Sequence, residues 1–342
     1  MGRRTGENGG MSPSRPHIGY AAMLERFHPT EAIGLAELAE AHRFTGVMAA
    51  DHFQPWLPRQ GQASFVWNVL SALGQRIEGD LGTGVTAPTY RAHPAVTAQA
   101  SATLAAMYPG RHWLGVGSGE ALNEHVTGQY WPEPPERINR MFEAVEIIKK
   151  LFASGLAHKD VRHDGQYYRM ESTRLWTMPE RAPEILIGTA GPVTAKRAGR
   201  VADGLITEGA PVEKLAPLLQ RFEEGARESG RKGLTKVLRL HLSWAATEEE
   251  AAANAVAEWP NGAIRATGDI RSPFELEQLA RMVRPEHFEG RMVISADPDV
   301  HRAHIQRMLD LGFDRVYLHN VGRNQAEFLE VFGRDVLPAL LR

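Results

Sequence analysis

The regular alternation of short apolar runs with longer amphipathic segments is the feature of this sequence that most constrains the fold. From His17 onward, each short run is followed by a segment whose apolar residues recur with helical spacing. The predicted strands are His17–Ala21, Gly46–Ala50, Leu81–Thr86, His112–Val116, Ile185–Gly188, Gly204–Thr207, Val237–Trp244 and Arg315–His319. This pattern favours an α/β protein with a (β/α)8 TIM barrel. A doubly wound open sheet is the alternative, but no Gly-x-Gly-x-x-Gly spacing follows the first strand.

Two stretches interrupt the alternation and are predicted to be insertions. Near 155–180, the segment Val161–Met170 contains Asp164-Gly165, which is a hairpin signal. Residues 259–290 are irregular, apart from a helix predicted over Pro273–Val283, and are expected to cover one end of the barrel. We expect a single domain over 16–342. Residues 1–15 are predicted to be a disordered leader, because no apolar stretch follows their arginines.

The composition excludes several classes of protein. Because the chain has no cysteine, zinc ribbons, thiol nucleophiles and disulfide scaffolds are excluded, and a reducing cytoplasm is the expected location. The net charge of -2 argues against nucleic acid as a partner, and no apolar run approaches the roughly 20 residues of a membrane span. Two histidine pairs have no carboxylate at ligand spacing, so we expect them to be solvated and no metal to be bound. These pairs are His158 with His163 and His301 with His304.

The residues after the second strand carry the strongest chemical signal. In a barrel, catalytic groups follow the carboxyl ends of the strands. Here an apolar run changes at once to Asp51-His52-Phe53-Gln54-Pro55-Trp56, and the proline prevents the strand from continuing. The stretch predicts a proton acceptor beside an aromatic wall. From this stretch alone, a helix cap made by Asp51 and His52 is an equal alternative.

The loop after the fourth strand combines alternating glycines with an acid. Gly115, Gly117 and Gly119 do not have the spacing of a phosphate-binding loop, but they suggest backbone brought close to a flat ligand. Glu120 then follows, either as a carboxyl at the mouth of a pocket or as an acid favoured by a helix N-terminus. After the fifth strand, Thr189-Ala190-Gly191 precedes a helix and could hold a phosphate or form an ordinary cap.

Together these motifs resemble the luciferase-like, coenzyme F420-dependent oxidoreductases. The motifs are Asp51–Trp56, Gly115–Asn123 and Gly188–Pro192, and the resemblance is strongest to the F420-dependent glucose-6-phosphate dehydrogenases. It implies a (β/α)8 barrel that binds the deazaflavin coenzyme F420 at the carboxyl ends of its strands. It also implies that His52 is the base, that Trp56 stabilises the intermediate and that Glu120 is the acid. These roles suit the oxidation of a hydroxyl-bearing carbon, because that reaction needs a base to accept the proton and a cofactor to accept the hydride.

The resemblance further implies a set of cofactor contacts. These are Asp51, Gly84, Val85, Ser118, Gly119, Asn123, Thr189, Ala190 and Gly191. A non-proline cis peptide after the third strand is common in the family, and Gly84-Val85 matches its position. Enzymes of the family commonly form dimers, so a homodimer is expected.

One departure from the family concerns the substrate. The glucose-6-phosphate enzymes hold the sugar phosphate with two lysines and an arginine, whose positions here align with Glu208, Gln278 and Arg291. A carboxylate disfavours a phosphate dianion at the first position, although Arg284 or Lys214 could bind it differently. The predicted activity is therefore F420-dependent oxidation of a sugar or sugar phosphate. The alternatives are an F420-dependent secondary alcohol dehydrogenase and an FMN-dependent luciferase-like monooxygenase. A barrel that only carries the cofactor would not need a paired base and acid.

Overall fold

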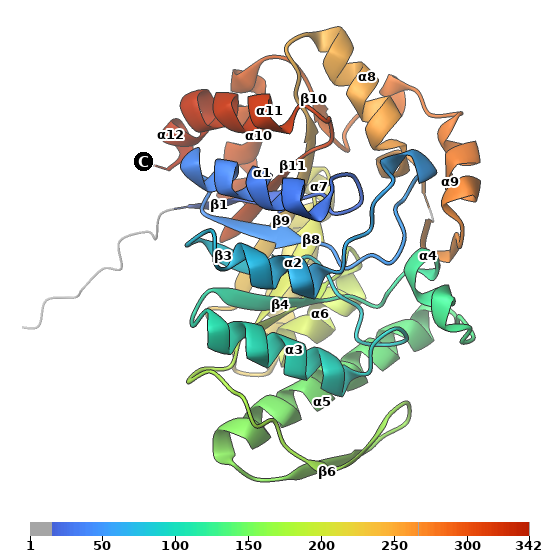
Figure 1. The fold of residues 1–342 in the computed structure, drawn as a ribbon, viewed down its shortest axis with the longest axis vertical. Helices are drawn as coiled ribbons and strands as arrows, with labels where there is room; N and C mark the ends of the chain where they lie inside the picture. The colour runs from blue at the N-terminus through green and yellow to red at the C-terminus, as the bar shows by residue number, and fades with distance from the viewer. Residues whose placement is uncertain (1–15, 266, 342) are drawn as a thin grey trace, which may run out of the picture.

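The eight predicted strands form a closed parallel barrel, which confirms the expected TIM-barrel fold (Figure 1). The structure is a computed structural model that describes residues 16–265 and 267–341. In order around the ring the strands are β1 (His17–Ala22), β2 (Gly46–Ala49), β3 (Asp80–Thr83), β4 (His112–Val116), β7 (Glu184–Gly188), β8 (Gly204–Glu208), β9 (Thr235–Ser243) and β11 (Arg315–Asn320). Pairing of β8 with β9 and of β11 with β1 closes the ring.

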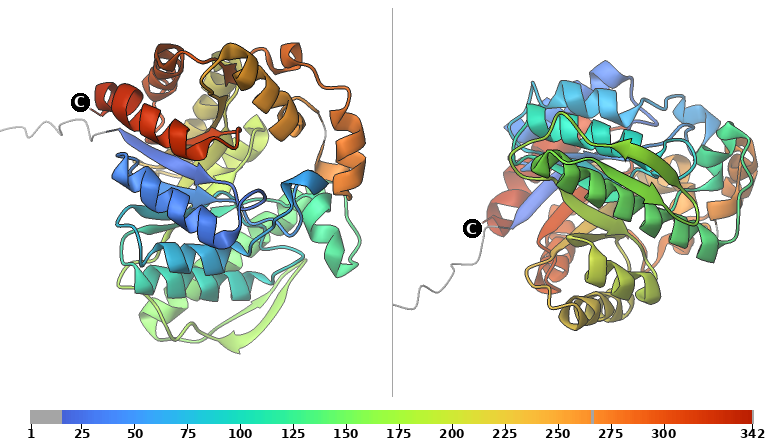
Figure 2. Two further views of the ribbon diagram at one scale, coloured as in Figure 1. Left: turned by 45° about the horizontal axis from the view of Figure 1, so that its top comes forward. Right: turned by 90° about the horizontal axis from the view of Figure 1, so that it is seen from below.

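Helices cover the outside of the barrel, as the alternation predicts (Figures 1 and 2). The long ones are α1 (Pro29–Ala41), α2 (Val66–Leu73), α3 (Pro94–Met107), α5 (Pro134–Ala157), α6 (Pro192–Val201), α7 (Val212–Glu228), α8 (Glu248–Glu258), α10 (Pro298–Asp310) and α11 (Gln325–Val331). α9 (Pro273–Ala280) is as long as α2, and the short helices are α4 (Ala121–Glu124) and α12 (Leu337–Leu340). The main hydrophobic core lies between these helices and the outer face of the strands. None of the described helices is long and apolar enough to cross a bilayer.

A second, smaller core fills the inside of the barrel. It is built around Trp113 and Tyr317, which are almost completely buried. A Cβ at Gly82 would lie only 1.9 Å from the Trp113 ring, so glycine makes room for the indole. Because these bulky side chains fill the half near the N-terminal ends of the strands, the opposite half is available to polar groups.

The first interruption of the alternation lies outside the barrel wall, and the second, residues 259–290, contributes residues to the end where the strands finish. The first is a hairpin of β5 (Val161–Asp164) and β6 (Arg169–Thr173), packed outside α5 (Figure 2). Glu143 of α5 accepts backbone N–H groups from its turn, at 2.9 Å in the case of Tyr168. In the second interruption, residues 259–290, Asp269 forms a 2.6 Å ion pair with Arg137 of α5. This ion pair attaches the segment to a helix of the barrel.

Three sequence expectations need adjustment. The third strand ends at Thr83 rather than Thr86, because the next peptide, Gly84-Val85, is cis. His163 and His301 are buried rather than solvated: His163 lies 3.2 Å from Glu143, and His301 bonds to the carbonyl of Ser295 at 2.9 Å.

Among the described residues, no cluster of side chains could hold a metal ion. The predicted leader, residues 1–15, lies outside the described residues.

Candidate active site

His52 lies at the mouth of the barrel and is paired with a buried carboxylate, that of Glu25. His52 follows β2, Glu25 follows β1, and the imidazole Nδ1 is hydrogen-bonded to the Glu25 carboxylate. Burial opposes both charges, but each partner stabilises the other, so the pKa of Glu25 is lowered and that of His52 is raised. Sequence reasoning missed Glu25, because it lies in a loop without a motif. Only its place just after a predicted strand could have suggested it.

The loops that follow β2 and β4 are bound to each other. The Asn123 side-chain oxygen accepts hydrogen bonds from the backbone of Phe53 at 2.8 Å and of Gln54 at 3.2 Å. The Gln54 amide donates to the carbonyl of Leu122 at 2.7 Å. These contacts bring the predicted base loop and acid loop together, although they lie about 70 residues apart in the sequence.

Trp56 and Glu120 share one cavity with His52. The Trp56 indole meets the imidazole edge to face, with ring centroids 5.3 Å apart. Glu120 is at the N-cap of α4 but makes no capping hydrogen bond, and its Oε2 is buried without a partner among the described residues. Burial raises the pKa of Glu120, although His52 opposes the shift. Glu120 therefore keeps its proton to a higher pH than an exposed glutamate.

Asp51 belongs to a charged cluster beside this cavity. Its carboxylate accepts a 2.6 Å hydrogen bond from Thr86 and lies 3.2 Å from the guanidinium of Arg91. The backbone N–H of Arg91 donates to Glu124 at 3.0 Å. Burial raises the pKa of Glu124 to about 7 despite this partner. Neither Arg91 nor Glu124 has a sequence signal of its own.

The expected cis peptide, Gly84-Val85, forms one wall of the mouth. A Cβ on Gly117 would lie 2.6 Å from Val85, so this glycine makes room for the valine side chain. Gly115 instead makes room for the Thr83 carbonyl, 2.1 Å from where its Cβ would lie, and Gly119 has a φ of +84°, so the alternating glycines have separate local causes. Val85, Ser118 and Gly119 all line the mouth.

The opposite wall is charged. Glu208 and Arg239 are register neighbours on β8 and β9, and the Arg239 guanidinium contacts the Glu208 carboxylate. Burial opposes ionisation of Glu208, but Arg239 outweighs it and holds the pKa of this carboxyl far below its usual value. Arg239 also donates to the carbonyl of Gly84 at 3.3 Å. Inward alternation along the predicted seventh strand could have found Arg239.

Two adjoining cavities occupy the mouth, of about 200 Å³ and 550 Å³. They share the residues Trp56, Glu120, Glu208 and Arg239. The smaller is further lined by Asp51, His52, Gly84, Val85, Ser118, Gly119 and Asn123, and the larger by Ala190, Lys214, Arg265, Thr267 and Arg291.

Three of the predicted cofactor- and substrate-binding residues, Thr189, Gly191 and Gln278, do not line either cavity. Thr189 accepts a 3.0 Å hydrogen bond from the backbone of Gly191 at the start of α6. Gln278 is exposed on α9, while Thr267, earlier in the same insertion, reaches the larger cavity. Because this insertion has little periodicity, the sequence alone did not determine which of its residues face the cavity.

The family described as "Luciferase-like monooxygenase" matches residues 7–315. The chain belongs to the luciferase-like family. Two curated relatives are the F420-dependent glucose-6-phosphate dehydrogenases of Microbacterium testaceum and Mycobacterium leprae. The first is 38% identical over 94% of this chain and 97% of the relative, and the second is 36% identical over 95% and 98%.

Solved structures share the fold of this chain. An F420-dependent secondary alcohol dehydrogenase, in complex with an F420-acetone adduct, superposes with a TM-score of 0.90 at 29% identity, covering 95% of this chain and 99% of that one. An F420-dependent tetrahydromethanopterin reductase from Methanopyrus kandleri shares the fold, with a TM-score of 0.78 at 21% identity over 96% of this chain and 100% of that one.

Proposed function

We propose that this chain is a coenzyme F420-dependent dehydrogenase that oxidises a hydroxyl-bearing carbon of a sugar or sugar phosphate. The observation that carries the proposal is that the His52–Glu25 pair and the unpartnered carboxyl of Glu120 lie at one mouth. The curated relatives, named F420-dependent glucose-6-phosphate dehydrogenases, support both cofactor and reaction.

The residues at the mouth fit a deazaflavin. Val85 offers an apolar platform, and Gly84, Ser118 and Gly119 line the same cavity. The buried, unpartnered Oε2 of Glu120 offers a polar partner for the ring edge. Asp51 and Asn123 flank this surface, and Ala190 lies at the adjoining cavity. When bound, coenzyme F420 supplies the hydride acceptor.

The side chains at the mouth then handle the protons. His52 accepts the proton of the substrate hydroxyl, and Glu25 fixes the orientation of the imidazole and stabilises its charged form. Burial raises the pKa of Glu120, which favours its role as the group that donates a proton. Trp56 packs on the imidazole and shields it from water.

The larger cavity supplies the substrate site. Lys214, Arg265 and Arg291 form a basic side that suits a phosphate, whereas Glu208 is occupied by its contact with Arg239. We therefore assign a phosphate group to the basic side and sugar hydroxyls to the Glu208 side. Gln278 is left out of this set, because its exposed position on α9 is outside the cavity.

The direct test is an assay of F420 reduction with hexose phosphates, free sugars and secondary alcohols as hydride donors. The reaction is monitored by the loss of F420 absorbance. Reduction by a sugar or sugar phosphate supports the proposal. Reduction by simple secondary alcohols alone would favour the activity named for the structural neighbour with a TM-score of 0.90. Binding of FMN with consumption of oxygen, and no reduction of F420, would show a monooxygenase.

A homodimer and a cytoplasmic location complete the proposal. Exposed apolar side chains such as Tyr130, Trp176 and Val193 are available for a subunit interface. Light scattering after size-exclusion chromatography measures the oligomeric state, and cell fractionation measures the location.

A further inference from the structure

Two histidines beside the charged wall are not used by the proposed chemistry: His241 lines the larger cavity, and His319 lines a small cavity next to the His52–Glu25 pair. His241 of β9 and His319 of β11 are register neighbours, and their Nδ1 atoms lie 2.5 Å apart. At this distance one nitrogen has to carry the proton and the other has to accept it. Trp259 packs against both rings, with centroids 4.9 Å and 4.6 Å away. Both rings are buried.

The carboxylate of Glu208 determines which nitrogen carries the proton. The Nε2 atom of His241 lies 3.6 Å from Glu208 Oε1, which can only accept. This distance is long for a hydrogen bond, but the negative charge favours the tautomer of His241 that has its proton on Nε2. The Nδ1 atom of His241 is then bare, so Nδ1 of His319 carries the shared proton and Nε2 of His319 is bare.

The bare nitrogen of His319 faces the catalytic pair. Its Nε2 is buried without a partner among the described residues. The small cavity on this side has a volume of about 10 Å³ and is also lined by Glu25, His52 and Arg239. That volume is roughly the space that one water molecule needs, and the lining offers it several polar partners.

We propose that Glu208, His241 and His319 form a proton-ordering chain that holds one water molecule against the His52–Glu25 pair. The water donates one hydrogen to Nε2 of His319 and is left with its second hydrogen for the Glu25 side. His319 is therefore a positioning residue, which acts on the base through the water and Glu25. This role depends on the proposed function only for its catalytic consequence.

The chain needs both histidines to stay neutral. Burial lowers the pKa of His241 and lowers that of His319 further. The charged groups around the two rings are Arg26 and Glu25 after β1, His52 after β2, Glu208 on β8 and Arg239 on β9. A further positive charge beside the two arginines is unfavourable, so both rings favour the neutral form that the chain needs.

The tautomers can be measured in the cofactor-free, full-length chain. In a ¹⁵N-histidine spectrum at neutral pH, we expect Nε2 of His319 to be bare and Nδ1 protonated. In Glu208→Gln the electrostatic bias is lost, and we expect a mixture of both forms. A charged His319, or a proton on its Nε2 in the unsubstituted protein, would overturn the proposal. This measurement needs neither F420 nor substrate, so its failure is distinct from failure of the proposed dehydrogenase activity.

Replacement of His241 tests the effect on the base. We expect His241→Phe to lower kcat about fivefold, the equivalent of one hydrogen bond, with F420 affinity unchanged. The acidic limb of the pH profile should also shift, because the water acts on the base. His319→Gln, which keeps an acceptor, should retain more activity than His319→Leu.

The matched control is His301→Gln. His301 is a buried histidine whose Nε2 is hydrogen-bonded to the carbonyl of Ser295 at 2.9 Å, and it lines neither cavity at the mouth. This variant should lower Tm without moving the pH profile. If His241→Phe behaves like this control, the two histidines at the mouth are structural and the proposal fails.

Discussion

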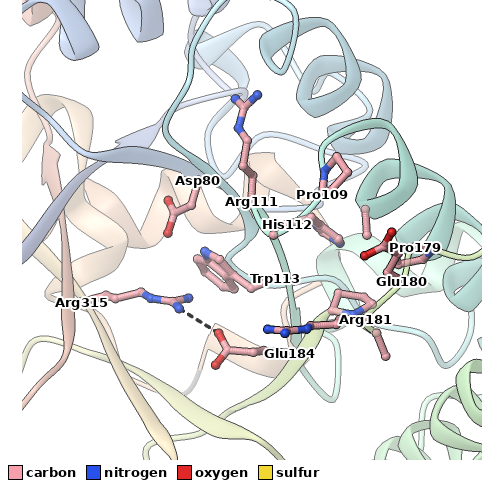
Figure 3. Close-up of a pocket in the computed structure, with 14 residues that line it drawn as sticks. Asp80, Pro109, Arg111, His112, Trp113, Pro179, Glu180, Arg181, Glu184 and Arg315 are labelled. Atoms are coloured by element: carbon pink, nitrogen blue, oxygen red, sulfur yellow. Dashed lines mark hydrogen bonds and ion pairs between the residues drawn. The ribbon is translucent and has the colours of Figure 1, made fainter.

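The two ends of the barrel use polar side chains in opposite ways. At the N-terminal end, Tyr317 donates to Asp80 at 2.6 Å and accepts from Trp113 at 3.0 Å. Nearby, Arg315 and Glu184 form a 2.8 Å ion pair (Figure 3). At the mouth, in contrast, Glu120 Oε2 and His319 Nε2 are buried without partners among the described residues.

This difference separates groups that hold the fold from groups that are free to react. A cavity of about 330 Å³ at the N-terminal end is lined by charged residues, yet none of its described lining atoms is buried without a partner. Arg111, for example, donates to the carbonyls of Gly79 and Gly74 at 2.9 and 3.2 Å. Buried atoms without a partner also occur elsewhere among the described residues, for example Thr45 Oγ1 and Arg231 Nε, but at the mouth they belong to a carboxyl and an imidazole that line cavities, which marks the mouth as the reactive end.

The largest effect is expected for His52→Gln. The amide can still donate to Glu25 but cannot accept a proton at neutral pH, so kcat should fall about 10³-fold. Stopped-flow measurement of F420 reduction tests this, with Tm recorded in parallel. Because the barrel does not depend on this imidazole, Tm should change little. If the variant kept a normal kcat, His52 would not be the catalytic base.

Glu120→Gln should have the next largest effect, a loss of about 10²-fold in kcat, together with a change in pH dependence. In the unsubstituted enzyme, we expect activity to rise as pH increases through the raised pKa of His52, because the base has to be neutral. We expect it to fall again at higher pH as Glu120, whose pKa burial raises, loses its proton. The variant should lack this alkaline limb. A full pH profile with an unchanged alkaline limb would assign the acid to another group.

How far the sequence could predict this arrangement depended on where each signal lies in the chain. Asp51–Trp56 and Glu120 follow strands directly, so the barrel rule alone brings them to one end. Glu25, Arg91 and Arg239 were missed because their roles arise only from contacts across the barrel. Gln278 was predicted only from its alignment with a lysine of the resembled family, and the structure places it on the exposed side of α9, outside both cavities.

At the N-terminal end, His112 should make stability depend on pH. It is buried between Ser101 and the carbonyl of Leu81, and burial lowers its pKa from 6.5 to about 4. With the folded pKa below the unfolded one, the stabilisation is complete above pH 6.5 and is lost as the pH falls towards 4. Between pH 6.5 and 5 the loss should be about 2 kcal/mol. Urea unfolding at both pH values measures this loss of stability. In His112→Gln the free energy of unfolding should fall by about 2 kcal/mol less over the same pH change. An equal loss in both proteins would show that His112 is not responsible.

The smallest effect is expected for Tyr317→Phe, which provides the converse of the His52 experiment. It removes the hydroxyl that joins Trp113 to Asp80 and leaves the indole N–H without its partner. The free energy of unfolding should fall by about 1–2 kcal/mol, the cost of leaving a buried polar group unpaired. Asp80 keeps a contact with His17 at 3.2 Å, which limits the loss. Chemical denaturation measures the stability, and kcat should be unchanged because Tyr317 lies at the opposite end of the barrel from His52. A large loss of activity without a loss of stability would mean that the two ends do not divide stability and chemistry between them.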